Sequence, residues 1–242
     1  MKLSVCMATR NGERFIGRQL SSILMQLGHD DEIVISDDSS TDRTIDIILS
    51  YADPRIHLLR GNTFFSPVFN FENALRHASG DVIALSDQDD VWLPNKVSVI
   101  HRLFENRPSP VYLVVMDGSV IDETDNEIAP SIFGSLRRPG RGIARNIFDN
   151  SYIGCCMAFS RELLPIALPF PGKIPMHDMW LGILAEVFGV TAFVSDKTVC
   201  YRKHGASMTG FAIRFMPWIQ IKRRWFLAMN LLKRWVLMKR RG

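Results

Sequence analysis

Three carboxylates follow an apolar run in the first half of the chain. Residues 81–92 read Asp-Val-Ile-Ala-Leu-Ser-Asp-Gln-Asp-Asp-Val-Trp, so Asp87, Asp89 and Asp90 come directly after a predicted buried strand. Hard cations such as Mg²⁺ take oxygen ligands, often one or two carboxylates together with substrate phosphates. A solvated acidic turn is the alternative for these residues taken alone. The pattern therefore indicates a candidate site for a divalent cation that holds a phosphate.

Two further polar clusters follow predicted strands earlier in the chain. Residues 9–12 read Thr-Arg-Asn-Gly, and residues 37–42 read Asp-Asp-Ser-Ser-Thr-Asp. Because open α/β sheets bind ligands beyond the carboxyl ends of their strands, we expect the three clusters to converge on one edge. Asp38 is positioned to accept an N–H of the nucleobase if a nucleotide binds at this edge. Thr41 or Asp42 is expected to cap the next helix. Neither cluster resembles a glycine-rich phosphate loop, so a metal is expected to neutralise the phosphates.

The elements that must position these clusters alternate between strand and helix. Apolar strands are predicted at residues 3–7, 32–36, 56–59, 82–85 and 111–116, and helices at residues 15–27, 42–51, 70–78 and 94–106. Strands that alternate with helices of this length predict βαβ units and a largely parallel sheet. The continuous apolar strands fit a sheet that is buried on both faces. The predicted fold class is therefore α/β, with a Rossmann-like, mostly parallel sheet flanked by helices.

Length and composition are those of one large folded domain. The 242 residues are 47% hydrophobic and 22% charged, which is ordinary for a globular protein with a sizeable core. No secretory signal and no 18-residue uncharged apolar run is visible, so no transmembrane helix is predicted. The four cysteines lack zinc-like spacing and have apolar neighbours. They are predicted to be small core residues in a reducing compartment: Cys6, Cys155, Cys156 and Cys200.

Basic charge is concentrated at the C-terminal end of the chain. Residues 211–242 hold nine Lys or Arg and no acid, mixed with Trp and Phe, whereas residues 1–210 carry a net charge of −5. This mixture is typical of an amphipathic helix on an anionic membrane surface, which is our preferred interpretation. A helix packed on the domain is the alternative, and nucleic-acid binding is disfavoured because the rest of the chain is acidic. We therefore divide the chain into a domain, 1–210, and a basic aromatic extension, 211–242.

Taken together, the motifs resemble the family 2 inverting glycosyltransferases, which have the GT-A fold. Residues 9–12 resemble the family's Thr-Tyr-Asn turn, with Arg10 in place of the aromatic residue. Residues 36–44 match its Asp-Asp-x-Ser-x-Asp-x-Thr segment, and residues 87–90 match its metal-binding Asp-x-Asp. The sequence His-Asp-Met-Trp at residues 177–180 stands where the family has its catalytic acid-base segment. The motifs Asp-Gln-Asp-Asp-Val-Trp and His-Asp-x-Trp resemble those of the rhamnosyltransferase-like branch in particular.

The resemblance implies roles for the donor-side residues. Asp38 would bind the nucleobase, and Thr9 and Asn11 would line the nucleotide pocket. Asp89 would be the principal ligand of Mg²⁺ or Mn²⁺, with Asp87 near the ribose or the metal. The cation would bridge the diphosphate and act as a Lewis acid on the leaving group.

Four more residues have implied or alternative roles. Asp178 would be the general base, with a pKa raised by its apolar surroundings, although an acid favoured by the helix dipole is the alternative. His204 either reaches the diphosphate or the metal, or is a surface or packing residue. Trp180 is expected in the core rather than under a sugar ring. Asp90 is expected to support its loop.

The expected activity is transfer of a sugar, with inversion, from a nucleotide-diphosphate sugar to a hydroxyl of a glycan or lipid-linked acceptor. The setting would be surface polysaccharide or lipopolysaccharide synthesis, by a cytoplasmic enzyme peripheral on the inner face of the cell membrane. The basic loop at residues 137–142 is either a lid ordered by the donor or a solvated loop. Two other classes compete: a nucleotidyltransferase that makes the sugar nucleotide, and a non-catalytic, membrane-associated protein that binds it.

Overall fold

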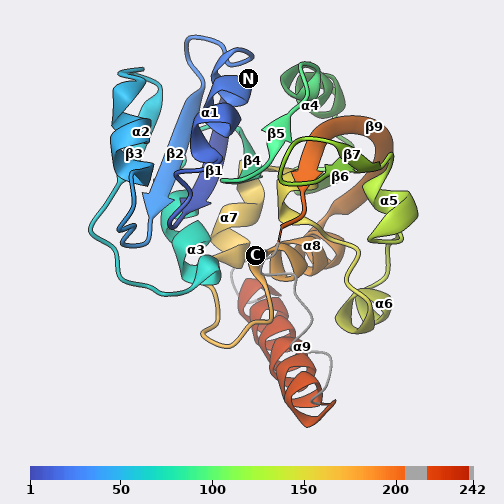
Figure 1. Cartoon of the computed structure of the whole chain (residues 1–242). Helices are drawn as coiled ribbons and strands as arrows, with labels where there is room; N and C mark the ends of the chain where they lie inside the picture. The colour runs from blue at the N-terminus through green and yellow to red at the C-terminus, as the bar shows by residue number, and fades with distance from the viewer. Residues whose placement is uncertain (205–216, 240–242) are drawn as a thin grey trace.

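One mixed sheet of nine strands forms the centre of the computed structural model, which describes residues 1–204 and 217–239 (Figure 1). Eight strands run across the sheet in the order β3 (Ile56–Leu59), β2 (Glu32–Asp37), β1 (Leu3–Thr9), β4 (Val82–Asp87), β8 (Met157–Ser160), β6 (Tyr112–Ile121), β9 (Val190–Arg202) and β5 (Val91–Trp92). The remaining strand, β7 (Glu127–Ala129), pairs with β6. The α/β fold class predicted from the sequence is confirmed.

The first four strands in the sequence are parallel, and they bring the polar clusters together. Thr9 at the end of β1 pairs with Asp37 of β2, and Ala8 pairs with Asp87 of β4. The carboxyl ends of β1, β2 and β4 therefore lie side by side. The expected convergence of the three clusters on one edge of the sheet is confirmed.

Beyond β4 the sheet is less parallel than the sequence predicts. Strand β8 runs antiparallel to both β4 and β6, and β5 runs antiparallel to β9, whereas β6 and β9 are parallel. The predicted fifth strand is part of β6, which extends to Ile121. The short strand β8, Met-Ala-Phe-Ser, lies between β4 and β6 in the sheet and was not predicted from the sequence.

Helices cover both faces of the parallel half. Because βαβ crossovers are right-handed, the outward path from β1 to β3 places α1 (Ile16–Leu24) and α2 (Thr44–Ser50) on one face, and the return to β4 places α3 (Pro67–His77) on the other. The other long helices are α4 (Lys96–Glu105) and α8 (His177–Phe188). Short helical segments complete the described domain: α5 (Ile132–Ser135), α6 (Ile143–Phe148), η1 (Gly154–Cys156), η2 (Arg161–Leu163) and α7 (Leu164–Ala167).

Residues 137–142, predicted as a basic loop, form no helix or strand and lie between α5 and α6. Gly142, the last of them, donates its amide to the carboxylate of Glu186 on α8, at 2.8 Å. The cysteines meet the prediction of core residues, since Cys6, Cys155 and Cys156 are buried and Cys200 is partly buried, all as free thiols.

The C-terminal helix, α9 (Pro217–Lys239), packs against the domain and projects away from the sheet (Figure 1). Leu227 and Leu231 are buried in the common core, and Arg234 donates to the carbonyl of Leu168 at 3.1 Å. Packing of the extension on the domain, the alternative considered above, is therefore correct for this face of the helix. The proposed boundary at residue 210 lies outside the described residues. No helix among the described residues is long and apolar enough to cross a membrane.

If α9 is an integral part of the core, truncation of two leucines of this helix to alanine should have very different effects on the free energy of unfolding. Replacing Leu227, which is fully buried, by Ala should lower the free energy of unfolding by about 2–4 kcal/mol through lost burial and a residual cavity. The matched change at Leu232, which is 55% exposed, should alter it by less than about 0.5 kcal/mol. Chemical denaturation of both variants checks this, and equal losses would contradict the packing of α9.

Candidate active site

Gln88 joins the first and third polar clusters. Its side-chain Oε1 accepts the amide N–H of Arg10 at 2.9 Å, and its Nε2 donates to the Arg10 carbonyl at 3.0 Å. Gly12 lies so close that a Cβ there would be 2.4 Å from Oε1 of Gln88. Sequence reasoning treated Gln88 as the spacer between two acids, and nothing in the sequence indicated this pairing across 78 residues.

Thr9 and Asn11 connect the first and second clusters. The Thr9 hydroxyl donates to Oδ2 of Asp37 at 2.9 Å, and Oδ1 of Asn11 accepts the amide of Thr41 at 2.8 Å. Asn11 has a φ of 50°, a left-handed conformation that asparagine tolerates better than most residues. Thr9 is fully buried, and its place in a nucleotide pocket stays a prediction. Asp42 accepts the amide of Thr44, the first residue of α2, but the N-cap position itself is held by Arg43 rather than by Thr41 or Asp42.

Asp38 is buried and orders the chain before α3. Its two carboxylate oxygens accept the amides of Phe64, at 2.6 Å, and Ser66, at 3.2 Å. An ionised carboxylate has about four acceptor positions, so lone pairs remain for a further donor. Contact with a nucleobase stays a prediction for this residue.

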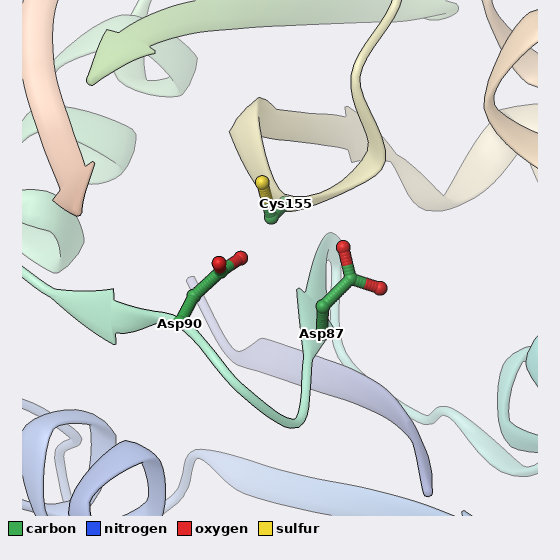
Figure 2. Close-up of side chains that lie close together, drawn as sticks. All are labelled: Asp87, Asp90 and Cys155. Carbon is green, nitrogen blue, oxygen red and sulfur yellow. The ribbon is translucent and has the colours of Figure 1, made fainter. Parts of the chain in front are cut away.

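The acids that follow β4 form a crowded, largely buried cluster with Cys155 (Figure 2). One ligand atom from each of Asp87, Asp90 and Cys155 lies within 4.8 Å of the others. Burial and then repulsion from Asp89 raise the pKa of Asp90 to about 7, and burial with repulsion from Asp90 raises the pKa of Asp87 well above its usual range. The turn therefore carries negative charge at a substantial free-energy cost.

The charge of Lys96 and the backbone amide of Arg202 offset part of that cost. The Lys96 side chain is fully buried, its Nζ donates to the carbonyl of Cys155 at 2.6 Å, and it lies 4.2 Å from the centroid of the Trp92 ring. Arg202 donates its amide to Oδ1 of Asp90 at 2.8 Å and its Nε to the carbonyl of Asp89 at 2.7 Å. Asp90 thus supports the loop, as expected. Lys96 was missed, although a lysine among the apolar positions of α4 was a visible signal.

Asp89 faces His204 at the end of β9. Oδ2 of Asp89 and Nε2 of His204 are 2.7 Å apart, although the residues are separated by 115 positions in the chain. The His204 ring lies against Phe15, with centroids 5.4 Å apart, which fixes its orientation. The structure brings His204 to the acid cluster, and its contact with the diphosphate or the metal stays a prediction. A carboxylate oxygen and an imidazole nitrogen at this separation are a suitable pair of ligands for a divalent cation.

Asp178 lies in the first turn of α8, close to the acid cluster. Its Oδ1 accepts the amide of Met179 at 2.5 Å. Burial raises the pKa of this carboxyl to about 6, against the lowering effects of that amide and of the Arg137 charge. The charge of Asp178 in turn helps to raise the pKa of Asp87, so the two acids share one electrostatic environment.

The residues that flank Asp178 belong to the core. Trp180 is fully buried and donates its Nε1–H to the carbonyl of Ala167 at 3.1 Å, which confirms the expected core role. His177 stacks on Phe71 with ring centroids 4.0 Å apart, and burial lowers the pKa of its imidazole to about 3. One cavity, of about 700 Å³, opens at the other end of β4, beside Val82.

Comparison with known proteins identifies the family. The model of the family described as glycosyl transferase family 2 matches residues 4–165. The chain belongs to this family. The glycosyltransferase is 32% identical over 187 residues to the Escherichia coli UDP-Glc:alpha-D-GlcNAc-diphosphoundecaprenol beta-1,3-glucosyltransferase WfgD, covering 76% of this chain and 70% of WfgD. It is 29% identical over 231 residues to the dTDP-rhamnosyl transferase RfbG of Shigella flexneri, covering 86% and 75% of the two chains.

Solved structures share the fold of this glycosyltransferase. S. aureus TarS in complex with UDP-GlcNAc matches with a TM-score of 0.70 and 20% identity, over 88% of this chain and 62% of TarS. The mannosyltransferase PcManGT from Pyrobaculum calidifontis, in complex with GDP-Man and Mn²⁺, matches with a TM-score of 0.60 and 23% identity, over 80% and 54% of the two chains. The predicted GT-A-type fold is thereby confirmed. The nucleotidyltransferase alternative is wrong, because the family is one of glycosyltransferases.

The fit between Gly12 and Gln88 of the glycosyltransferase can be tested by a double-mutant cycle. Gly12→Ala should cost about 1–3 kcal/mol of stability, because the new methyl group displaces the amide that joins the two loops. In a Gln88→Ala background the same change should cost less, since the obstructing side chain is gone. Urea denaturation of the four proteins measures the coupling. Additive losses would show that Gln88 does not occupy this position.

Proposed function

We propose that this glycosyltransferase moves a sugar from a nucleoside diphosphate sugar to an acceptor hydroxyl, with inversion at the anomeric carbon. The observation that carries the proposal is the placement of two kinds of group at one sheet edge. One is the Asp89–His204 pair, and the other is Asp178, an acid with a pKa of about 6. Relatives named for UDP-glucose and dTDP-rhamnose, and TarS solved with UDP-GlcNAc, support a nucleotide-sugar donor.

The donor set at this edge fits Mg²⁺ or Mn²⁺. Asp89 and His204 would hold the cation, with Asp87 beside them. Two observations support a cation here: the crowding of carboxylates, and the buried Oδ2 of Asp90, which lacks a hydrogen-bond partner among the described residues. When bound, the cation supplies neutralisation of the charge that develops on the departing diphosphate. PcManGT, of similar fold, was solved with Mn²⁺.

Asp178 would act as the general base. As the acceptor oxygen attacks the anomeric carbon, its proton passes to the Asp178 carboxylate, and the bond from that carbon to the diphosphate oxygen breaks on the opposite side. A single displacement of this kind inverts the configuration. A carboxylate whose pKa is raised toward the working pH is a stronger base than an exposed aspartate and is still ionised at neutral pH.

The acceptor side carries positive charge suited to an anionic or lipid-linked acceptor. Arg137 acts on Asp178 electrostatically, and Arg138 and Arg141 are exposed on the same segment. A diphosphate next to the accepting sugar would find its counter-charge here. The relative WfgD is named for a diphosphoundecaprenol acceptor. We accordingly propose that the enzyme works in polysaccharide synthesis at the inner face of the cell membrane, held there by its basic extension.

Removal of Asp89 should uncouple nucleotide binding from the metal. In Asp89→Ala, calorimetry should find that Mn²⁺ no longer strengthens the binding of UDP or dTDP, because the principal cation ligand is lost. Asp30→Ala changes an exposed acid away from the site and should leave the Mn²⁺ effect intact. An unchanged Mn²⁺ effect in Asp89→Ala would overturn the metal assignment.

Removal of the base should abolish transfer but leave donor binding. Asp178→Asn should lower the turnover number by about 10²–10⁴-fold, with Asp30→Asn as the matched control. In the wild-type enzyme, turnover should fall about tenfold per pH unit below pH 6, because Asp178 then takes up a proton, and should level off above it. Near-normal turnover of Asp178→Asn, or a wild-type profile flat down to pH 4, would contradict the assignment. Absence of any transfer by the wild-type protein would favour the non-catalytic alternative.

A further inference from the structure

Helix α9 has two apolar stripes on opposite faces. Side chains that are three or four positions apart share a face of an α-helix. The inner stripe packs on the domain and consists of Leu227, Leu231 and Met238. The outer stripe lies on the opposite side of the helix, about 180° away, and consists of Trp225, Met229, Leu232 and Val236. A helix whose only task was to complete the core would need the inner stripe alone.

The outer stripe is turned toward solvent. Trp225 is 69% exposed and Leu232 is 55% exposed, while the equivalent inner leucines are buried. Met229 is 37% exposed and Val236 is partly buried. Large exposed aromatic and aliphatic groups in one row mark an interaction site more often than scattered single ones. The outer stripe is therefore a candidate docking surface.

The basic residues beside the outer stripe indicate the kind of partner that it binds. Lys233 and Lys239 flank the outer stripe, and Nζ of Lys239 lies 4.2 Å from the centroid of the Trp235 ring. Residues 211–242 contain nine cations and no acid. A dimer formed by pairing α9 with its own copy would bring two strongly basic helices together, which like-charge repulsion disfavours. A layer of anionic lipid headgroups above hydrocarbon complements both the cations and the apolar stripe.

Helix α6 lies next to α9 and carries another exposed aromatic side chain. Phe148, at the end of α6, is 69% exposed, and the Arg224 guanidinium lies 5.2 Å from its ring centroid and donates to its carbonyl at 3.0 Å. Figure 1 shows α6 beside α9 at the end of the molecule away from α1 and α2. Phe148 is carried by the segment that also contains Arg137 and Asn150, and both of these residues act to lower the pKa of Asp178.

We propose that the outer stripe of α9, together with Phe148 of α6, docks on an anionic lipid bilayer. The inference deepens the proposed function, on which it rests for the need to meet a membrane-borne acceptor. The inner stripe and Arg234 fix α9 to the domain, so docking sets the orientation of the whole enzyme. The α6 segment then lies at the bilayer, with the acceptor side of Asp178 next to it.

The test uses the full chain and co-sedimentation with vesicles of phosphatidylcholine, with and without phosphatidylglycerol. Trp225→Ser and Phe148→Ser should each weaken binding to the anionic vesicles roughly tenfold, since each removes an aromatic anchor from the lipid. Leu49→Ser, which alters a 52% exposed residue on α2, should bind as the wild type does. All three variants should keep the wild-type thermal midpoint and Mn²⁺-dependent nucleotide binding, which separates loss of docking from loss of fold or of donor site.

Each outcome decides a part of the proposal. Wild-type binding by Phe148→Ser combined with weak binding by Trp225→Ser would remove α6 from the surface. Undiminished binding by both would overturn the proposal. If Trp225→Ser binds vesicles as the wild type does but has a different mass from the wild type in sedimentation without vesicles, the stripe belongs to contact with a second copy instead. Vesicle binding that persists in Asp89→Ala or Asp178→Asn would show that docking stands even where the proposed catalytic assignments fail.

Discussion

Electrostatic repulsion among buried acids at the end of β4 is the constraint around which the active-site edge is built. Asp87 and Asp90 are crowded by Asp89, and each has its pKa raised by burial and by its neighbours. Such a turn is stable only if other parts of the fold supply positive charge and hydrogen-bond donors. In this protein they come from α4, which provides Lys96, and from the end of β9, which provides Arg202.

Arg202 shows how far this compensation extends. Besides the Asp89–Asp90 turn, its guanidinium donates to the carbonyl of Asp122 at 2.8 Å and to the carboxylate of Asp125 at 2.6 Å, and it lies 4.7 Å from the centroid of the Phe15 ring. One nearly buried side chain thereby ties together the turn after β4, the β6–β7 turn and the start of α1. His204, two residues later, is carried by the same strand end to Asp89.

The proposed acceptor side is held differently, by a network centred on one partly buried acid. Glu186 of α8 accepts bonds from the amide of Gly142, the side chain of Asn146 and the hydroxyl of Tyr152. This network fixes α6 against α8, the helix that begins beside Asp178. The proposed base and the proposed membrane-facing segment therefore share a support, which the proposed donor side does not use.

The sequence alone determined the parallel βαβ half of the sheet, the convergence of residues 9–12, 37–42 and 87–90, and the place of Trp180 in the core. These features follow from short-range patterns: apolar strands, helical spacing, and the rule that parallel strands end at one edge. The tertiary structure decided what depends on long separations in the chain. The Gln88–Arg10 pairing, Lys96 beneath the acids, the insertion of β8 and the contact of Asp89 with His204 join residues that no local pattern relates. The two faces of α9 were likewise separated only by packing, because one helical segment rich in apolar and basic residues fits either a core or a lipid surface until its neighbours are known.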